Sequence, residues 1–233
     1  MFFLFMIFSE FSFREFLKKR PLDAFLFDLD GTLLDSREGI IETVYTFLKS
    51  KGIPSNKKKI ATLFGTPIEE LFRVFMPSYT EEQIKEFVSE IREIYAKNHL
   101  ELVRIFPGVK QLLSSLKRAN YKIGLASTKY KPFIMEALEH FKFANFFDVI
   151  ASGYEVKNHK PAPDLLFYAA KLLGVPPEKC IYIGDSQTDV LAGKAAKMAT
   201  ILVSTNNYPE TLVKKLNPDF VVSSIDSLLN YFR

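Results

Sequence analysis

Two short acidic segments lie far apart in the chain, and each follows an apolar run. The first contains Asp28 and Asp30 followed by Gly31, and the second contains Asp185 and Asp189. Two carboxylates followed by a glycine can direct side chains and backbone groups at one small volume. Each segment taken alone also has an ordinary structural interpretation, because aspartate caps helices and Asp-Gly forms turns.

Together, the four carboxylates would repel one another at a common site unless protons or a cation were present. A bound hard divalent cation is the simplest way to neutralise this repulsion. Oxygen ligands without histidine or cysteine favour magnesium, which usually keeps several waters and takes substrate phosphate oxygens as further ligands. The sequence therefore predicts Mg²⁺ as the cofactor.

Hydroxyl and ammonium groups follow two further apolar segments. Ser127 and Thr128 end one run, and Lys160 follows another. A hydroxyl donor and an ammonium group beside a metal-bound carboxylate cluster suit a phosphoryl group, whose transfer is accelerated by positioning and charge neutralisation. These residues predict phosphoryl chemistry on a small phosphorylated metabolite.

The order of elements along the chain predicts a scaffold that brings these segments together. Apolar runs of strand length alternate with amphipathic segments of helix length, the pattern of an α/β fold in which helices cover both faces of a parallel sheet. Ligands of such sheets bind outside the carboxyl ends of the strands, so the polar segments should meet there. The expected strands are 24–28, 121–126, 147–151, 180–183, 200–203 and 220–222, with helices beginning near Val109, Lys131, Pro163, Thr188, Pro209 and Ile225.

Residues 36–101 interrupt this alternation with helical periodicity and no strand candidate. We expect a first helix with Ile40 and Val44 on its buried face, a second helix capped from Thr66, and a third begun by a capping box at Thr80. The three lysines at 57–59 are interpreted as a solvated face. The predicted organisation is an N-terminal extension (1–20), an α/β core (21–35 and 102–233) and a helical insert (36–101).

Composition sets limits on the class of protein. The chain has 233 residues, of which 48% are hydrophobic and 25% charged, which is typical of a globular protein and excludes disorder. A net charge of +4 is too mild to indicate nucleic-acid binding. The single cysteine, Cys180, cannot form an internal disulfide and is expected to be a small buried hydrophobe in a cytoplasmic protein.

The N-terminus is apolar from Met1 to Phe8. This run is far shorter than the roughly 20 residues of a membrane helix and lacks the features of a secretory signal, so we expect no membrane span. Residues 12–15 have the spacing of a capping box, which predicts a short helix before Pro21. Two interpretations of this N-terminal segment stay open: an arm that packs on the rest of the protein, or a surface that binds a partner or a membrane.

The segments 28–32, Ser127, Lys160-Pro161 and 184–189 resemble, in this order, the motifs of the haloacid dehalogenase superfamily. The resemblance extends from about Ala24 to the C-terminus and is most similar to phosphoglycolate phosphatase-like members, which include pyrophosphatases and nucleotide and sugar-phosphate phosphatases. It implies a Rossmann-like parallel sheet, with the helical insert serving as an all-helical cap.

The resemblance also implies a mechanism. Asp28 would be the nucleophile that forms an aspartyl phosphate, and Asp30 would be the general acid and base. Magnesium would be held by Asp28, the Asp30 backbone carbonyl and Asp185, with Asp189 acting directly or through water. Phosphoryl oxygens would be bound by Ser127 and nearby N–H groups, and Lys160 would offset negative charge. The implied phosphate-binding residues are Gly31, Thr32, Ser127, Thr128 and Lys160.

The sequence departs from the family pattern at three places, and several alternative functions stay open. Thr128 replaces an asparagine common among these relatives, and Lys197 and Asn206-Asn207 stand where glycine is usual, so the helix end at Lys197 should close differently. Asp30 disfavours a dehalogenase or phosphonatase. A phosphosugar mutase shares the core motifs, while a receiver-like phospho-acceptor module and a structural protein with a decayed site remain as other classes.

Specificity and assembly are the least determined properties. A phosphatase of this kind selects its substrate through the closing cap, so residues 64–67 and 98–100 are the candidates for recognising the leaving group. No catalytic role is assigned to His99, His140 or His159. A monomer or homodimer is expected, acting on a small phosphate monoester.

Overall fold

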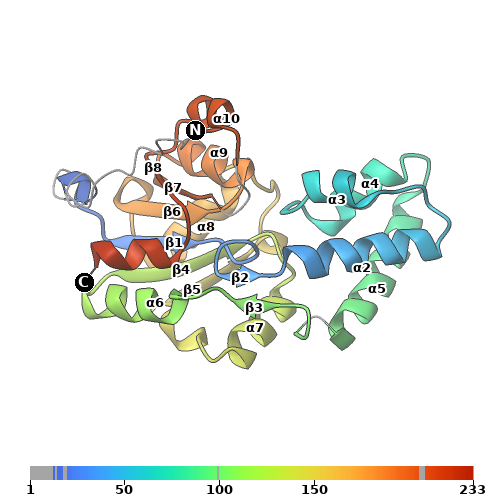
Figure 1. The fold of residues 1–233 in the computed structure, drawn as a ribbon, viewed down its shortest axis with the longest axis horizontal. Helices are drawn as coiled ribbons and strands as arrows, with labels where there is room; N and C mark the ends of the chain where they lie inside the picture. Colours follow the sequence, from blue (N-terminus) through green and yellow to red (C-terminus); the bar gives the residue numbers. More distant parts are fainter. Residues whose placement is uncertain (1–12, 14, 18–19, 99, 205–207, 233) are drawn as a thin grey trace, which may run out of the picture.

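A computed structural model describes residues 13, 15–17, 20–98, 100–204 and 208–232 of the chain. Its centre is a six-stranded sheet with the order β5-β4-β1-β6-β7-β8, in which every neighbouring pair is parallel (Figure 1). The expected class, a parallel α/β sheet, is confirmed. The strands are β1 (Ala24–Phe27), β4 (Lys122–Ser127), β5 (Val149–Ser152), β6 (Cys180–Gly184), β7 (Ala199–Val203) and β8 (Phe220–Val222).

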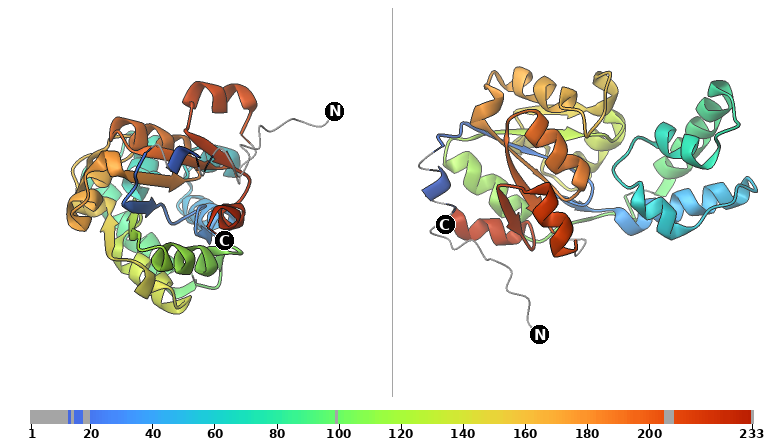
Figure 2. Two further views of the ribbon diagram at one scale, coloured as in Figure 1. Left: turned by 90° about the vertical axis from the view of Figure 1, so that its left-hand side faces the viewer. Right: turned by 90° about the horizontal axis from the view of Figure 1, so that it is seen from above.

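Helices cover both faces of this sheet (Figure 2). Alternate residues of β1 explain why its run is wholly apolar: Phe25 and Phe27 join the hydrophobic cluster on one face, and Ala24 and Leu26 join the cluster on the other. The first cluster includes residues of α6, α7 and the C-terminal 3₁₀ segment, and the second includes residues of α8 and α9. The helices of the core are α6 (Val109–Arg118), α7 (Lys131–His140), α8 (Asp164–Leu173), α9 (Gln187–Ala195), α10 (Glu210–Leu216) and η4 (Asp226–Tyr231), with shorter 3₁₀ turns η1 (Ala144–Phe146), η2 (Gly153–Glu155) and η3 (Pro177–Lys179).

Four helices lie to one side of the sheet and share a hydrophobic cluster of their own, to which Val44, Phe47 and Phe72 belong (Figure 1). We call these helices the insert. They are joined to the core by a two-stranded antiparallel ribbon that the sequence did not predict, formed by β2 (Leu34–Asp35) and β3 (Arg104–Ile105). The helices of the insert are α2 (Arg37–Ser50), α3 (Lys57–Thr62), α4 (Ile68–Phe75) and α5 (Glu81–Asn98).

The expected helix starts in the insert are partly realised. At α5 the Gln83 N–H donates to Thr80 Oγ1 (3.3 Å) and the Thr80 N–H donates to Gln83 Oε1 (2.9 Å), so the predicted capping box is present. The prediction that Thr66 caps α4 is wrong, because its hydroxyl donates to the carbonyl of Leu63 (2.8 Å). The N-cap position is occupied by Pro67, which has no side-chain donor or acceptor, and the helix begins at Ile68. Residues 57–59 form the exposed first turn of α3, as a solvated face should.

The end of α9 corrects another expectation. Lys197 adopts φ +60°, the Lys197 N–H donates to Lys194 O (2.9 Å), and the Met198 N–H donates to Gly193 O (2.9 Å). This is the Schellman closure that glycine usually makes, so the helix does not close differently; a lysine takes the left-handed position instead. The corresponding expectation for Asn206-Asn207 lies outside the described residues.

Near the N-terminus, Phe13 is buried and its ring lies 4.9 Å from that of Phe220 and 4.8 Å from that of Tyr231. The expectations for Met1–Phe8, and part of the capping box at 12–15, lie outside the described residues. Cys180 is buried, as predicted, and burial raises the pKa of its thiol to about 12. No helix in the described part of the chain combines the length and apolarity needed to span a bilayer.

Candidate active site

Three buried carboxylates meet at the carboxyl end of the sheet. Asp28 directly follows β1, and Asp185 follows β6, its hydrogen-bonded parallel neighbour; Asp189 lies in the first turn of α9. One oxygen of each carboxylate lies within 4.8 Å of the other two. The parallel register, with Phe27 opposite Ile183, explains why residues distant in sequence converge.

A glycine makes this close approach possible. Gly31 has φ +86°, and a Cβ atom there would lie 2.4 Å from Asp185 Oδ2, a distance no side chain tolerates. The next residue, Thr32, is buried and its hydroxyl donates to Asp185 Oδ1 (3.2 Å). The loop after β1 therefore reaches the end of β6 because residue 31 has no side chain.

The protonation behaviour of the carboxylates reflects their crowding. Burial raises the pKa of Asp28 to about 7, although Lys160 acts in the opposite direction. Burial, followed by the charges of Asp189 and Asp28, also raises the pKa of Asp185 well above its usual value. Burial would raise the pKa of Asp189 too, but the Lys160 ammonium and the hydrogen bonds from Ser186 outweigh the effect of burial. The pKa of Asp189 therefore lies below its usual value.

These donors fit a magnesium ion. The cluster offers carboxylate oxygens without nitrogen or sulfur, which is the ligand set Mg²⁺ prefers, and a divalent cation would relieve the cost of ionising Asp28 and Asp185. Asp189 is less available, because its Oδ1 accepts from Lys160 Nζ (2.6 Å) and its Oδ2 accepts from the Ser186 N–H (2.9 Å).

Lys160 occupies the centre of the polar network. Its Nζ donates to Asp28 Oδ1 (2.9 Å) and to Asp189 Oδ1, and lies 3.0 Å from the hydroxyl of Tyr182. That hydroxyl also lies 3.1 Å from the Ala126 carbonyl oxygen. Tyr182 was not among the predicted site residues; the available signal was a side chain with one polar atom inside the otherwise apolar run of β6.

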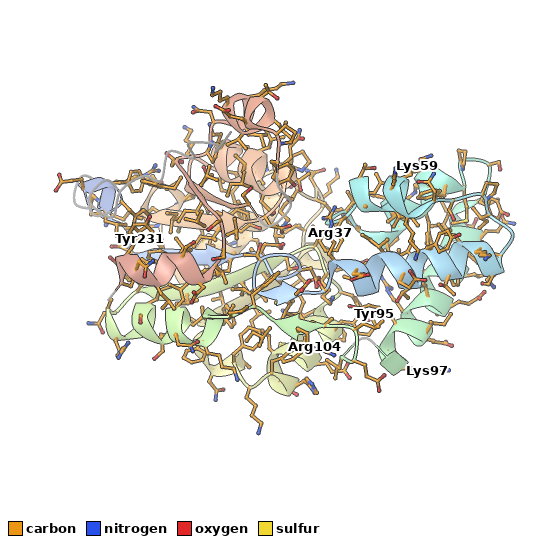
Figure 3. The ribbon with its side chains drawn as sticks, in the orientation of Figure 1. Arg37, Lys59, Tyr95, Lys97, Arg104 and Tyr231 are labelled. Carbon is orange, nitrogen blue, oxygen red and sulfur yellow. The ribbon has the colours of Figure 1, made fainter. Side chains whose placement is uncertain are left out.

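Asp30 belongs to a second, separate network. Lys129 Nζ lies 3.1 and 3.0 Å from its two carboxylate oxygens, and Ser36 donates to Oδ1 (2.6 Å). Lys129 also donates to the hydroxyl of Tyr95 (2.9 Å), which belongs to α5 of the insert and lies between that helix and the core (Figure 3). Burial would lower the pKa of Lys129, but Asp30 and Tyr95 together raise it.

Ser36, Tyr95 and Lys129 were not among the predicted site residues. Lys129 directly follows the predicted Ser127 and Thr128, so its position was the strongest available signal. Tyr95 lies on an amphipathic helix, where an aromatic side chain usually packs in a core, and the contact of its hydroxyl with Lys129 of the core has no sequence signature.

The two predicted hydroxyl residues at the end of β4, Ser127 and Thr128, have different surroundings. Ser127 Oγ accepts a hydrogen bond from the Lys129 N–H (3.3 Å) and lines the same cavity as Asp28. Thr128 Oγ1 instead donates to the Gly65 carbonyl oxygen (2.8 Å), so this hydroxyl joins the core to the insert.

A cavity of about 150 Å³ lies between these networks and the insert. Asp28, Asp30 and residues 127–129 contribute to its core side, and residues 64–67 contribute to its insert side, as the specificity prediction requires. The other candidate segment, 98–100, does not line this cavity where the structure describes it, and His99 falls outside the described residues.

His159 Nδ1 is buried without a hydrogen-bond partner.

Comparison with known proteins agrees with this geometry. A family model described as haloacid dehalogenase-like hydrolase matches residues 25–203. A curated relative from Halalkalibacterium halodurans, "Pyrophosphatase PpaX", is 32% identical over 90% of this chain and 96% of its own length. Among solved structures, a putative haloacid dehalogenase-like hydrolase from Bacteroides fragilis has a TM-score of 0.82 at 28% identity, covering 89% of this chain and 99% of that one.

A second solved structure, β-phosphoglucomutase from Clostridium difficile, has a TM-score of 0.78 at 28% identity, covering 90% of this chain and 97% of that one. Fold, site and comparisons together define an α/β enzyme of the phosphatase class. The chain belongs to the haloacid dehalogenase-like hydrolase family, as the resemblance implied.

Proposed function

We propose that this protein is a magnesium-dependent phosphatase that hydrolyses a small phosphate monoester through an aspartyl-phosphate intermediate on Asp28. The observation that carries this proposal is the placement of two differently held aspartates on one cavity. Asp28 lies beside Lys160 and Asp185 in the metal-fitting cluster, whereas Asp30 is held by Lys129 and Ser36. Such different surroundings suit different roles, with Asp28 as the nucleophile and Asp30 as the general acid and base.

In the first step, an Asp28 carboxylate oxygen attacks phosphorus and the bond to the leaving oxygen breaks, while Asp30 donates a proton to that oxygen. In the second step, Asp30 accepts a proton from water, which attacks the aspartyl phosphate and releases inorganic phosphate. Dividing the reaction in this way replaces one difficult displacement with two easier ones. Lys129 keeps Asp30 in place for both transfers.

Magnesium would be held by Asp28 and Asp185 with the Asp30 backbone carbonyl, and Asp189 would act on the metal through water, since Lys160 and Ser186 occupy its oxygens. When bound, the ion supplies charge neutralisation for the phosphoryl oxygens. Gly31, Thr32, Ser127 and Lys160 would orient the phosphoryl group, and Thr128 would contribute through its backbone, because its hydroxyl bonds to Gly65. The insert would act as the cap that excludes water.

Two other activities have a specific observation in their favour. The relative from Halalkalibacterium halodurans is named a pyrophosphatase, so pyrophosphate is the second candidate substrate. The structural similarity to a β-phosphoglucomutase favours a phosphosugar mutase as the third. We further propose that the enzyme acts in the cytoplasm as a monomer or homodimer.

The direct test measures inorganic phosphate released from a panel of phosphate esters and pyrophosphate by the purified protein with Mg²⁺. We expect many turnovers per molecule, loss of release in Asp28→Asn, and loss on removing the ion with a chelator. A single turnover followed by a long-lived phosphorylated protein would indicate a phospho-acceptor module instead. Equal release by the wild type and Asp28→Asn would overturn the proposal.

A further inference from the structure

The cavity above Asp28 has two chemically different sides. Its polar side consists of Asp28, Asp30 and residues 127–129 at the carboxyl end of the sheet. Its remaining wall is contributed largely by apolar side chains of the insert, together with Phe133 of α7. The apolar side chains of this wall include Ile40, Val44, Leu63, Phe64, Ile91 and Phe133.

The threonine hydroxyl groups that line the cavity are directed at backbone carbonyls. Thr43 donates to Gly39 O (2.9 Å), Thr66 donates to Leu63 O (2.8 Å), and Thr128 donates to Gly65 O. Each of these side chains uses its one O–H group within the protein. At these three positions a negatively charged leaving group would therefore meet hydroxyl oxygens rather than hydroxyl donors.

The cationic side chains that line the cavity in the described part of the chain are Arg92 and Lys129, and both are paired. Arg92 binds Glu69 (2.8 Å) and its guanidinium lies over the rings of Tyr130 and Tyr154, with 4.4 and 5.0 Å to the ring centroids. Lys129 is engaged with both oxygens of Asp30. The charge of each cation is therefore already balanced by a carboxylate of the protein, and a second anionic group would compete with Glu69 for Arg92 or with Asp30 for Lys129.

The size of the cavity limits the group that it can accept. Its volume is about 150 Å³. An apolar cavity of about 150 Å³ in another protein accepts benzene, so a leaving group larger than one six-membered ring would not be enclosed here. Burying an unpaired carboxylate or second phosphate against such a wall is unfavourable, whereas burying an uncharged hydrocarbon group is favourable.

We propose that the substrate is a phosphate monoester whose alcohol is uncharged and apolar, up to the size of a single ring. This inference rests on the proposed phosphatase function and narrows it. It predicts that the enzyme discriminates against phosphoglycolate and pyrophosphate, because each carries a second anionic group into the apolar part of the cavity.

The test compares isobutyl phosphate with phosphoglycolate, two esters in which a branched hydrocarbon and a carboxylate occupy nearly the same volume. Benzyl phosphate and pyrophosphate complete the set, and all are assayed with Mg²⁺. We expect kcat/KM for isobutyl and benzyl phosphate to exceed that for phosphoglycolate and pyrophosphate by about 100-fold, the scale set by an unpaired buried charge.

A charge introduced into the wall should change this preference. Leu63 is half-buried at the end of α3, where a lysine can bury its stem and extend its ammonium toward the cavity. We expect Leu63→Lys to raise the kcat/KM ratio of phosphoglycolate to isobutyl phosphate by about 10-fold or more. Leu63→Met, the matched control, keeps the wall apolar and should leave the ratio within about threefold.

The outcomes separate this inference from the function on which it rests. A wild-type preference for phosphoglycolate or pyrophosphate over both apolar esters would overturn the inference and leave the phosphatase function standing. Absence of release from every ester, with the wild type indistinguishable from Asp28→Asn, would overturn both.

Discussion

Lys160 Nζ lies 2.9 Å from Asp28 Oδ1, although 132 residues separate the two in the sequence. The same ammonium binds Asp189, so one buried cation stabilises two buried carboxylates. Removing it would leave both carboxylates buried without their cationic partner, and unpaired buried charges are costly.

We therefore predict that Lys160→Met lowers the free energy of unfolding of the metal-free protein by about 3–5 kcal/mol and abolishes phosphate release. Chemical denaturation monitored by circular dichroism measures the first effect. Lys179→Met is the matched control, since Lys179 forms an exposed pair with Asp23 at 3.0 Å and its removal should cost about 0–1 kcal/mol. Similar losses in the two variants would contradict the central role of Lys160.

Magnesium binding should depend on pH. The pKa of Asp28 is raised from 3.8 to about 7, so its contribution to the stability of the metal-free protein is complete below about pH 4 and is lost as the pH rises through about 7. Because the metal needs the ionised carboxylates, Mg²⁺ affinity should increase by about tenfold or more per pH unit between pH 6 and 7, and the raised pKa of Asp185 should extend the increase to higher pH. Isothermal titration calorimetry measures this.

Asp28→Asn is the control for the pH dependence of metal binding. The amide does not titrate, so this variant should bind Mg²⁺ more weakly and with a flatter dependence on pH. An affinity of the wild type that stays constant from pH 6 to 8 would show that Asp28 is not a ligand.

The contact between Tyr154 and Glu69 joins the core to the insert. The Tyr154 hydroxyl donates to Glu69 Oε2 (2.7 Å), and Arg92 binds the other oxygen of the same carboxylate. We predict that Tyr154→Phe raises KM by about fivefold, equivalent to one hydrogen bond of about 1 kcal/mol, and speeds amide exchange in α4. Exchange in α4 identical to that of the wild type would show that this contact does not hold the insert.

The left-handed residue after α9 allows a stabilising substitution. Lys197 has φ +60°, which glycine adopts without steric cost. We predict that Lys197→Gly raises the free energy of unfolding by about 0.5–1 kcal/mol in thermal denaturation. Lys194→Gly, within the same helix, should lower it by about 1 kcal/mol. A loss of stability in both variants would show that the main chain at 197 is not left-handed in solution.

Much of the α/β core could be predicted from the sequence because strands buried on both faces are short apolar runs. The six expected strands all exist, with ends displaced by two residues or fewer, and the polar residues that follow β1, β4 and β6 meet as parallel topology requires. The two-residue ribbon of β2 and β3 could not be found, since a strand of that length has no periodicity.

The side-chain pairing in the site was the part beyond prediction. Nothing in the sequence indicates that Lys129 binds Asp30 or that Tyr95 of the insert reaches Lys129, because these contacts depend on how the insert sits on the core. For the same reason Thr128 was expected at the phosphoryl group, whereas its hydroxyl bonds to the insert at Gly65.

The central claim is covalent catalysis by Asp28, and trapping the intermediate tests it most directly. The protein is mixed with a ³²P-labelled ester and Mg²⁺, quenched with acid within milliseconds, and the labelled peptide is sequenced by mass spectrometry. We expect acid-stable label on Asp28 of the wild type and none in Asp28→Asn. Label on another residue, or rapid turnover with no labelled protein at any time, would contradict it.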